Sequence, residues 1–370
     1  MRVDAESEHA DVNHKEWRVT PLQIREFAAR ALMAAHSDPE PAWSVATAIT
    51  ETSVRGIDSH GIRLLLHYAK VVQTGRINPR PRLTFRQTGP GSGIVNADHG
   101  FGHHASYFAM DHATLLAKTN GIAAVSAIDS SHFGSAGCYA LKAAEKGLVA
   151  IAVCNSDSFV LAHDGVQQFN GTNPIAFAAP VPGSRPLLVD MATSVIPWNR
   201  VQDLMNEGLP LPPDVAVDKE GEVTIDPTES AALLPLGGTH YGYKGAALAS
   251  MVEVLSSILS GMPYCSQLPA MAGPDFTTRR RISHFFIVID PGRYVSSELY
   301  STGMQAYLRD LRGQPARKGK KVLAPGDREW DVTEDRTEWG IPVASQLKKD
   351  LDSLADSLDI SRIVYVSSPE

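Results

Sequence analysis

The chain has 370 residues, of which 43% are hydrophobic and 20% charged, and its formal net charge is −7. A chain of this length and composition forms a large core, in two domains or in one elaborated domain. The acidic balance argues against the basic surface that attracts nucleic acids and anionic membranes, so we expect neither as a partner.

The N-terminal residues and the cysteines indicate the compartment. Residues 1–15 are charged and poor in apolar groups, so we predict a disordered tail without a secretion signal. Cys138, Cys154 and Cys265 form no C-x-x-C pair and leave an odd thiol, which fits a reducing cytoplasm. The most apolar stretch, 246–259, is too short to span a membrane, and we expect a buried helix there.

Helical patterns dominate the first 75 residues. Thr20 is a predicted N-cap, and Pro21 occupies the first helical position. Further helices are predicted over 41–54 and 61–74, each followed closely by a glycine. Successive prolines within 78–82 forbid a helix and predict an extended segment.

From residue 84 onward strands and helices mix. We expect strands at 84–86, 93–95, 122–128, 148–153, 175–179, 187–190 and 285–290, and helices at 105–118, 136–146 and 295–311. The two alternate regularly only between 122 and 153, which is too brief to establish a doubly wound parallel sheet. We predict an α+β fold in which a mostly helical domain, 16–85 plus 300–370, packs around an α+β domain, 86–299.

Two dense glycine clusters invite comparison with a dinucleotide-binding loop. They are Gly89-Pro-Gly-Ser-Gly93 and Gly100-Phe-Gly102. A Rossmann fingerprint needs a strand before it and a helix that opens at its last glycine. Pro90 lies inside the first cluster, and a strand follows it. We interpret these glycines as turns, so a dinucleotide would bind here without the usual loop.

Polar groups gather at the ends of apolar runs between residues 129 and 194. The segments are Asp129–Gly137, Cys154–Ser156, Gly171–Pro174 and Asp190–Ser194. They bring an imidazole, hydroxyls and a carboxylate to strand and helix ends, where a scaffold displays a site. This pattern is typical of an enzyme.

Two histidines are candidates for proton transfer. His60 and His132 each lie beside serine and glycine at an element boundary, and an imidazole pKa near 6.5 suits such a role. The alternative for each is a structural loop histidine. His99, His103 and His104 have no adjacent acidic or thiol partner, so we interpret them as hydrogen-bonded loop histidines and expect no metal site.

A series of motifs resembles one known family. They are Asp58–Gly61 with Tyr68, Ser131–Gly134, Asn155–Ser156, Gly171–Pro174, Asp190–Ser194, Leu236–Gly238, Lys244–Gly245 and Pro325–Asp327. Together, from about Val19 to Ile341, they resemble the malate/L-lactate dehydrogenase family that lacks a Rossmann fold. The resemblance implies a homodimeric enzyme whose cofactor domain has a mixed, largely antiparallel sheet.

The implied reaction is hydride transfer between NAD or NADP and a small 2-hydroxy acid/2-oxo acid pair. One alternative is an NAD(P)H-dependent reductase of a cyclic imino acid, which would use the same carboxylate clamp on a C=N acceptor. A second alternative is a non-catalytic ligand-binding protein on the same fold. Cofactor turnover with an oxo acid, a cyclic imine or neither separates the three.

The resemblance also implies roles for substrate-binding residues. His132 matches the proton acceptor of the ureidoglycolate branch, and His60 matches the proton donor of the diketogulonate branch. We assign His132 as the acid/base, with His60 and Ser59 polarising the substrate oxygen or binding its carboxylate. Arg63 is either the ionic clamp for that carboxylate or a solvated helix arginine. Thr172 is a further candidate substrate-binding residue.

A second set of residues is implied to contact the dinucleotide. Asp190 either holds a ribose hydroxyl or orients a histidine, and Lys244 either reaches a phosphate or is a surface lysine. The full set is Ser156, Asp190, Met191, Ala192, Lys244, Pro325, Gly326 and Asp327.

The chain departs from the family pattern in two places that bear on substrate choice. Many relatives place an arginine four residues after the first histidine, where this chain has Leu64 and Arg63 precedes it. On a helix this turns the side chain by about 100°. After Ser194 relatives commonly carry small residues and a glycine, whereas this chain has Val195-Ile-Pro-Trp-Asn199. We expect this segment to reshape the site that it borders.

Overall fold

The structure is a computed structural model, and residues 17–367 of it are described. Its largest sheet has the strand order β2-β3-β4-β13-β5-β8-β9. These strands are Thr84–Gly89, Ser92–Asn96, Ile122–Ser130, Ile282–Ile289, Val149–Cys154, Ile175–Ala179 and Leu187–Met191, in that order. Only the β3–β4 pair is parallel within this sheet. The predicted mixed, largely antiparallel sheet is therefore confirmed.

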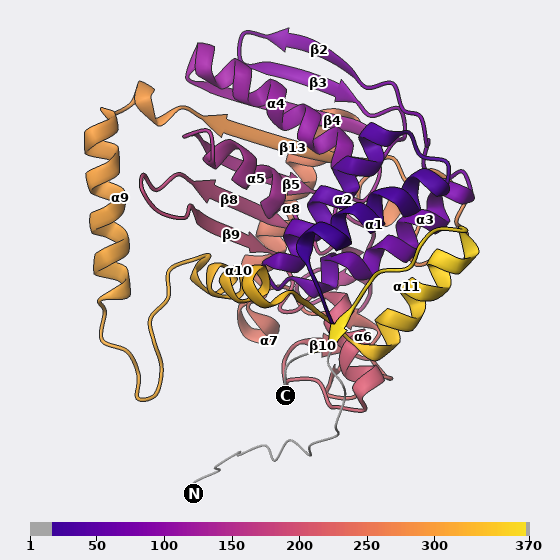
Figure 1. Cartoon of the computed structure of the whole chain (residues 1–370). Coiled ribbons are helices and arrows are strands. Elements are labelled where there is room, and N and C mark those ends of the chain that lie inside the picture. Colours follow the sequence, from indigo (N-terminus) through magenta and orange to yellow (C-terminus); the bar gives the residue numbers. More distant parts are fainter. Residues whose placement is uncertain (1–16, 368–370) are drawn as a thin grey trace, which may run out of the picture.

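Helices cover both faces of this sheet (Figure 1). α4 (Gly102–Asn120) and α5 (Gly137–Ala144) pack on one face, and α8 (Tyr243–Ser256) lies on the other. Alanines at the buried positions of α4 and α5 let the helices approach the strands closely, and Phe286 and Val288 of β13 fill the space beneath them. Gly121, with φ of 87°, ends α4 and turns the chain into β4.

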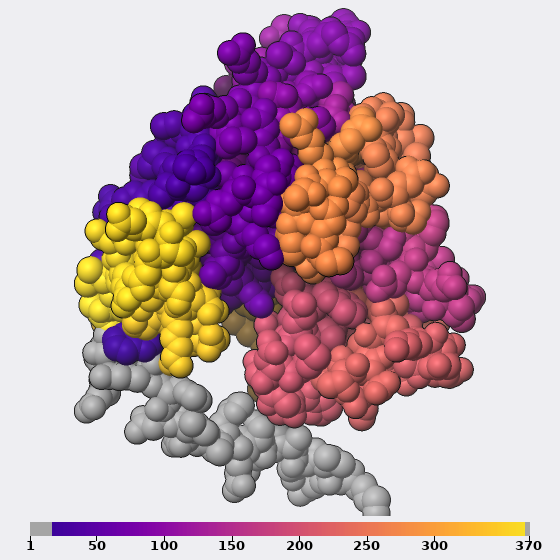
Figure 2. Space-filling model, turned by 90° about the vertical axis from the view of Figure 1, so that its right-hand side faces the viewer, coloured from indigo at the N-terminus to yellow at the C-terminus, as the bar shows by residue number. Residues whose placement is uncertain are grey.

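The N- and C-terminal segments share a second core. α1 (Pro21–Ala34), α2 (Pro39–Val54) and α3 (Leu65–Gln73) pack with α11 (Ser345–Ser357) around Phe27, Ile49 and Leu351. Beside them a small sheet pairs β1 (Trp17–Val19) with β14 (Ile341–Val343) and β15 (Val366–Ser367). Figure 2 shows this contact on the surface, where the C-terminal residues lie against the N-terminal ones.

The segment between β5 and α8 forms a third, smaller core. A sheet in the order β11-β10-β12-β6-β7 carries α6 (Trp198–Glu207) on it. Its strands are Val223–Thr224, Ala216–Val217, Ala232–Leu233, Val160–Leu161 and Gln168–Asn170. Val201 and Leu204 form the buried face of α6 against Val160 and Leu233. Short strands with little alternation give no periodic signal, so the sequence did not predict this sheet.

Two long helices, α9 (Ser297–Arg312) and α10 (Asp327–Trp339), lie between β13 and β14 in the sequence. α9 stands at the edge of the molecule in Figure 1, and Leu308 is its one buried residue. Leu308 packs with Val181 and Ala324 in a small cluster apart from the two large cores. The short helices of the C-terminal half are α7 (Gly238–Tyr241) and the 3-10 turns Ile258–Ser260, Cys265–Gln267 and Pro291–Arg293.

Three expectations from the sequence need correction. The predicted helix 61–74 begins as a helix only at Leu65, because residues 58–64 form two 3-10 turns that meet at Gly61. The helix predicted as buried near 246–259 is α8, and Met251 and Val254 are 43% and 49% exposed on its outer side. His103 and His104 lie in the first turn of α4 rather than in a loop, and neither ring nitrogen of His103 has a hydrogen-bond partner.

The division into a helical domain and an α+β domain remains a prediction, and the predicted tail at 1–15 lies outside the described residues. Among residues 17–367 no helix is long and apolar enough to cross a membrane. Within the same range no cluster of histidine, cysteine and carboxylate side chains is arranged to hold a metal ion.

Candidate active site

His60 and His132 lie face to face, although 72 positions of sequence separate them. Their ring centroids are 5.8 Å apart, and the ring planes differ by 25°. The 3-10 turn Asp58–His60 presents His60, and the loop between β4 and α5 presents His132. Two candidates that the sequence could not rank thus belong to one site.

The Tyr68 hydroxyl contacts one ring nitrogen of His132. The phenolic oxygen lies 2.7 Å from Nδ1 of His132, and the backbone N–H of Gly134 points at the same nitrogen from 3.4 Å. The Tyr68 contact fits either tautomer of the neutral ring, and in the tautomer with the proton on Nδ1 the ring donates to the Tyr68 oxygen and Nε2 can accept a proton. Tyr68 is fully buried and comes from α3.

Burial keeps both rings neutral at pH 7. It lowers the pKa of His132 well below the usual value, and the positive charge of Arg280 adds to the effect. Burial also lowers the pKa of His60, which the Asp190 carboxylate opposes and Arg63 reinforces. A neutral imidazole is a base, so the pair can accept a proton from an alcohol.

The Asp190 carboxylate is fixed at the start of α5. One oxygen, Oδ2, accepts hydrogen bonds from the Ser135 hydroxyl and from the backbone N–H of Gly137, the latter at 2.9 Å. Gly137 leaves no space for a side chain, since a Cβ there would lie 2.7 Å from Oδ2. The charge of Asp190 acts to raise the pKa of His60, but the carboxylate makes no hydrogen bond to that ring.

The turn that carries His60 is tied to α6. The Ser59 hydroxyl lies 2.9 Å from Nδ1 of His60, and the Ser59 carbonyl accepts a hydrogen bond of 2.9 Å from the Asn199 amide. Nη1 of Arg63 pairs with Oδ1 of Asp203 at 2.9 Å, and both side chains are 32% exposed. The guanidinium of Arg63 is therefore already paired with a carboxylate, and its side chain is only partly exposed to solvent.

A second guanidinium stands behind His132 in the buried part of the site. Arg280 forms an ion pair with Asp157, and both side chains are almost fully buried. Asp157 also accepts a hydrogen bond of 2.9 Å from the backbone N–H of Met271. Because Arg280 and Asp157 pair with each other, neither leaves an unpaired charge in this buried region.

Several of the predicted contact positions are linked by short hydrogen bonds. The Ser156 hydroxyl accepts from the backbone N–H of Thr172 at 2.9 Å and lies 3.3 Å from its hydroxyl. The Thr172 carbonyl accepts from the backbone N–H of Thr193, next to Ala192. The Thr193 carbonyl in turn accepts from Leu236, and the Leu236 carbonyl accepts from Gly245, next to Lys244. The structure therefore brings Ser156, Thr172, Ala192 and Lys244 into one neighbourhood.

The remaining predicted dinucleotide contacts lie along the edge strand β9. Met191 ends this strand and is 37% exposed. The Pro325 carbonyl accepts from the backbone N–H of Leu188, and Gly326, with φ of 96°, starts α10. The Asp327 carboxylate is held by two hydrogen bonds from Arg312, which keep its pKa below the usual value. Pro325–Asp327 thus caps the end of β9 opposite Met191.

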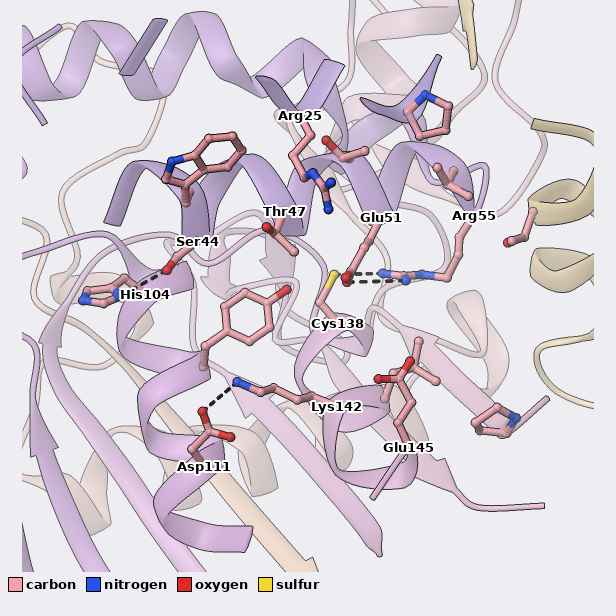
Figure 3. A pocket seen from close by; sticks show the side chains of 18 of the residues that line it. Arg25, Ser44, Thr47, Glu51, Arg55, His104, Asp111, Cys138, Lys142 and Glu145 are labelled. Atoms are coloured by element: carbon pink, nitrogen blue, oxygen red, sulfur yellow. Dashed lines mark hydrogen bonds and ion pairs between the residues drawn. The ribbon is translucent and has the colours of Figure 1, made fainter. Parts of the chain in front are cut away.

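A cavity lies elsewhere in the structure, and none of the predicted site residues lines it. It measures about 970 Å³ and opens between α1, α2, α4, α5 and α10 (Figure 3). Burial raises the pKa of Glu51 at its floor, and Arg55 lies 3.9 Å from that carboxylate. Arg55 also donates to Sγ of Cys138, the residue after Gly137. We assign the chemistry to the histidine pair because His60 and His132 belong to the sequence motifs described above, whereas none of the residues that line the cavity does.

Sequence reasoning missed several groups that complete the site. Tyr68 was part of a motif, but its contact with His132 depends on a helix that starts at Leu65. Asn199, Asp203 and the Arg280–Asp157 pair gave no signal, because each lies far along the chain from the residue that it contacts.

The structure thus has two neighbouring histidines on an α+β fold with a mixed, largely antiparallel sheet. The chain belongs to the malate/L-lactate dehydrogenase family, whose model matches residues 19–352. The resemblance inferred from the motifs is therefore confirmed, and with it the class of NAD(P)-dependent dehydrogenases that act on hydroxy acids.

Three curated relatives indicate the range of this family. The chain is 36% identical to the NAD(+)-dependent ureidoglycolate dehydrogenase of Escherichia coli O157:H7, over 78% of this chain and 81% of the relative. It is 32% identical to a malate dehydrogenase of Pyrococcus abyssi, over 91% and 94%. It is 31% identical to the NADP(+)-dependent (2R)-3-sulfolactate dehydrogenase of Chromohalobacter salexigens, over 86% and 93%.

Solved structures agree with these matches. The malate dehydrogenase of Pyrococcus horikoshii superimposes with a TM-score of 0.85 at 30% identity, covering 94% of this chain and 97% of its own. The Δ1-piperideine-2-carboxylate reductase of Pseudomonas syringae superimposes with a TM-score of 0.82 at 29% identity, covering 91% and 99%. Both a hydroxy acid dehydrogenase and an imine reductase therefore share this fold.

Proposed function

We propose that this protein oxidises a small 2-hydroxy acid to the 2-oxo acid, or catalyses the reverse reduction, with NAD or NADP as the hydride carrier. The observation that carries the proposal is the buried pair His60–His132 with Tyr68 behind one ring and Asp190 near the other. A neutral imidazole beside a fixed carboxylate suits removal of a hydroxyl proton.

His132 is the acid/base in this proposal. In the oxidation it takes the hydroxyl proton while the hydride leaves the same carbon, which becomes the carbonyl carbon of the oxo acid. His60 and Ser59 donate hydrogen bonds to the substrate oxygen or carboxylate. Arg63 supplies the positive charge for the carboxylate, and Thr172 borders the site near Ser156.

The residues present fit a dinucleotide, which when bound supplies the acceptor or donor of the hydride. In the described part of the chain, Nζ of Lys244 has no carboxylate partner and stands over the rings of Tyr241 and Tyr243 at the start of α8. Such an ammonium suits a phosphate. Asp190, Met191 and Ala192 would lie along the cofactor, with Ser156 at one end and the backbone of Pro325–Asp327 at the other. The Asp327 side chain, already paired with Arg312, would hold the turn rather than the ligand.

Reduction of a cyclic imino acid is the second candidate. The structural match to a Δ1-piperideine-2-carboxylate reductase favours it, since that enzyme shares the whole fold. The same carboxylate clamp serves both reactions, and His132 would then deliver or hold the proton at the imine nitrogen.

The decisive assay is absorbance at 340 nm with NADH and NADPH in parallel, against small 2-oxo acids and cyclic imines. Consumption with an oxo acid supports the dehydrogenase, and consumption with an imine alone supports the second candidate. No consumption with any member, in protein that calorimetry shows to bind no dinucleotide, would contradict the proposal.

We also propose a homodimer in the cytoplasm. Leu299 and Tyr307 of α9 are 67% and 56% exposed, and α8 exposes Met251 and Val254, so both helices offer apolar area to a second copy. The three cysteines are buried and unpaired, which suits a reducing compartment. Sedimentation should give twice the 39.9 kDa chain mass, and a monomer at micromolar concentration would contradict the dimer.

A further inference from the structure

The helix α6 is held over the site by its own apolar face. Val201 and Leu204 are buried in the small core, and Trp198 stacks on Phe159 with ring centroids 5.6 Å apart. The helix lies in the stretch that departs from the family pattern, where Val195–Asn199 stands in place of small residues and a glycine.

Two polar side chains of α6 reach the turn that carries His60. Asn199 and Asp203 are four residues apart, so they lie on one face of the helix, one turn apart. Asn199 holds the Ser59 carbonyl, and Asp203 holds the Arg63 guanidinium. Arg63 uses one of its five donors in this contact, and the described hydrogen bonds include no other from its side chain.

The charged groups around the histidine pair leave no free positive charge for a second anionic group of a substrate. Arg63 and Arg280 are the guanidinium groups that lower the pKa of His60 and His132, and each is already paired, with Asp203 and Asp157 respectively. The Asp190 carboxylate is a third anion, held only by neutral donors. The buried guanidinium of Arg55 lies close enough to Asp190 for their charges to interact, so with both imidazoles neutral the surroundings of the pair hold no excess positive charge.

We infer that Asp203 is a specificity-determining residue that restricts the site to 2-hydroxy and 2-oxo acids with a single anionic group. The inference rests on the proposed function and on Arg63 as the carboxylate clamp. The free donors of Arg63 bind the one carboxylate of the substrate, while Asp203 stays paired with Nη1 of the same guanidinium and keeps its negative charge beside the substrate. A second carboxylate or a sulfonate on the substrate then meets Asp203 or Asp190 without a free cation to receive it.

This distinguishes the chain from relatives named for malate and sulfolactate, which each carry two anionic groups. The accepted class is a monoanion whose third carbon bears an uncharged group, including groups with N–H donors that Asp203 can accept. Asn199 is a positioning residue in this scheme, because it fixes the backbone at Ser59 and does not touch the substrate.

The test compares 2-oxobutyrate with oxaloacetate, in which a carboxylate replaces the terminal methyl group. The wild-type protein should show a higher kcat/KM for 2-oxobutyrate. Asp203→Asn removes the charge and keeps the shape, so the ratio of the two kcat/KM values should shift about tenfold or more toward oxaloacetate, a typical effect of one nearby charge at a partly exposed site. Glu207→Gln on the same helix, whose carboxylate lies 3.9 Å from Arg200, removes the same charge away from the turn and should leave the ratio unchanged.

Two results would overturn the inference: a wild-type preference for oxaloacetate, or an unchanged ratio in an active Asp203→Asn variant. A second measurement separates this failure from failure of the proposed function. Calorimetry with oxamate and oxalate, which differ by an amide against a carboxylate, needs no turnover. Tighter binding of oxamate that the Asp203→Asn variant equalises supports the inference even if no oxo acid is reduced. Equal binding of both anions to the wild-type protein contradicts it.

Discussion

The hydroxyl of Tyr68 lies 2.7 Å from Nδ1 of His132, inside a wall that solvent does not reach. Together with the Gly134 N–H, this contact fixes the ring and determines which nitrogen faces the open side of the site. In the proposed reaction the other ring nitrogen, Nε2, exchanges the proton with the substrate, which requires the ring proton on Nδ1. The orientation of His132 depends on α3, a helix from the other core.

Replacement of Tyr68 by Phe should lower kcat about tenfold and leave KM nearly unchanged, since one hydrogen bond to a neutral ring contributes roughly 0.5–1.5 kcal/mol. The loss arises because the ring is free to turn. Steady-state kinetics at several pH values measures the effect. Tyr300→Phe on α9 is a matched control, and a Tyr68→Phe variant with wild-type kcat would rule out this role.

Replacement of Asp190 by Asn should lower the pKa of His60 further. Burial already lowers that pKa, and the Asp190 charge is the influence that opposes it. Removal of the charge leaves burial and Arg63, both of which favour the neutral ring. NMR titration of the His60 ring protons measures the shift. Asp111→Asn, on α4 beside Lys142, is the control, and an unchanged or higher pKa in the Asp190 variant would be inconsistent with the structure.

Replacement of Asn199 by Ala should raise KM for the substrate about three- to tenfold with a smaller change in kcat, as expected for one lost hydrogen bond. The Ser59 carbonyl loses its donor, so the turn that carries His60 and Arg63 is less well ordered before the substrate binds. Gln202→Ala removes a neighbouring amide of α6 as a control. Equal KM values for the two variants would indicate that Asn199 does not position the turn.

Acid should destabilise the protein through its buried histidines. Burial lowers the pKa values of His103 and His284 to about 3 each. Below pH 6.5 the unfolded chain binds protons at these rings and the folded chain does not, so the stability present above pH 6.5 declines as the pH falls. Between pH 6.5 and 5 the two groups together should remove about 3 kcal/mol from the free energy of unfolding.

Urea unfolding at pH 7 and pH 5 tests this expectation. His284→Gln can keep contacts with Cys154 and Ser130 without a titrating group, and it should reduce the loss between the two pH values by about half. A free energy of unfolding that is equal at both pH values would contradict the buried, neutral state of these rings.

The sequence was informative where a local pattern determines local structure. The Thr20–Pro21 start of α1 follows from capping chemistry alone, and the structure adds the reciprocal Gln23 contact. The strands of the large sheet are apolar and bounded by turns, so their positions were predicted to within a few residues. The rejection of a Rossmann loop at Gly89–Gly93 also held, because that cluster forms the β2–β3 hairpin.

Contacts that bridge distant segments were not predictable. Asn199 and Ser59 are 140 positions apart, as are Asp203 and Arg63, and no spacing rule connects them. The helix predicted over 61–74 starts only at Leu65, because two 3-10 turns precede it. In the structure, the Ser53 hydroxyl accepts a hydrogen bond from the Ile62 N–H. The Ser53 side chain also leaves Gly61 no space for a Cβ.

The most direct test of the account is the rate of hydride transfer in His132→Ala, followed by single-turnover absorbance at 340 nm alongside His60→Ala and the wild-type protein. With His132 as the acid/base, its removal should slow hydride transfer by roughly 10²–10⁴-fold while the Kd for the dinucleotide stays close to the wild-type value. The His60 variant should chiefly raise KM. A His132→Ala variant that transfers hydride at nearly the wild-type rate, with His60→Ala inactive, would contradict the assignment and reverse the roles of the two histidines.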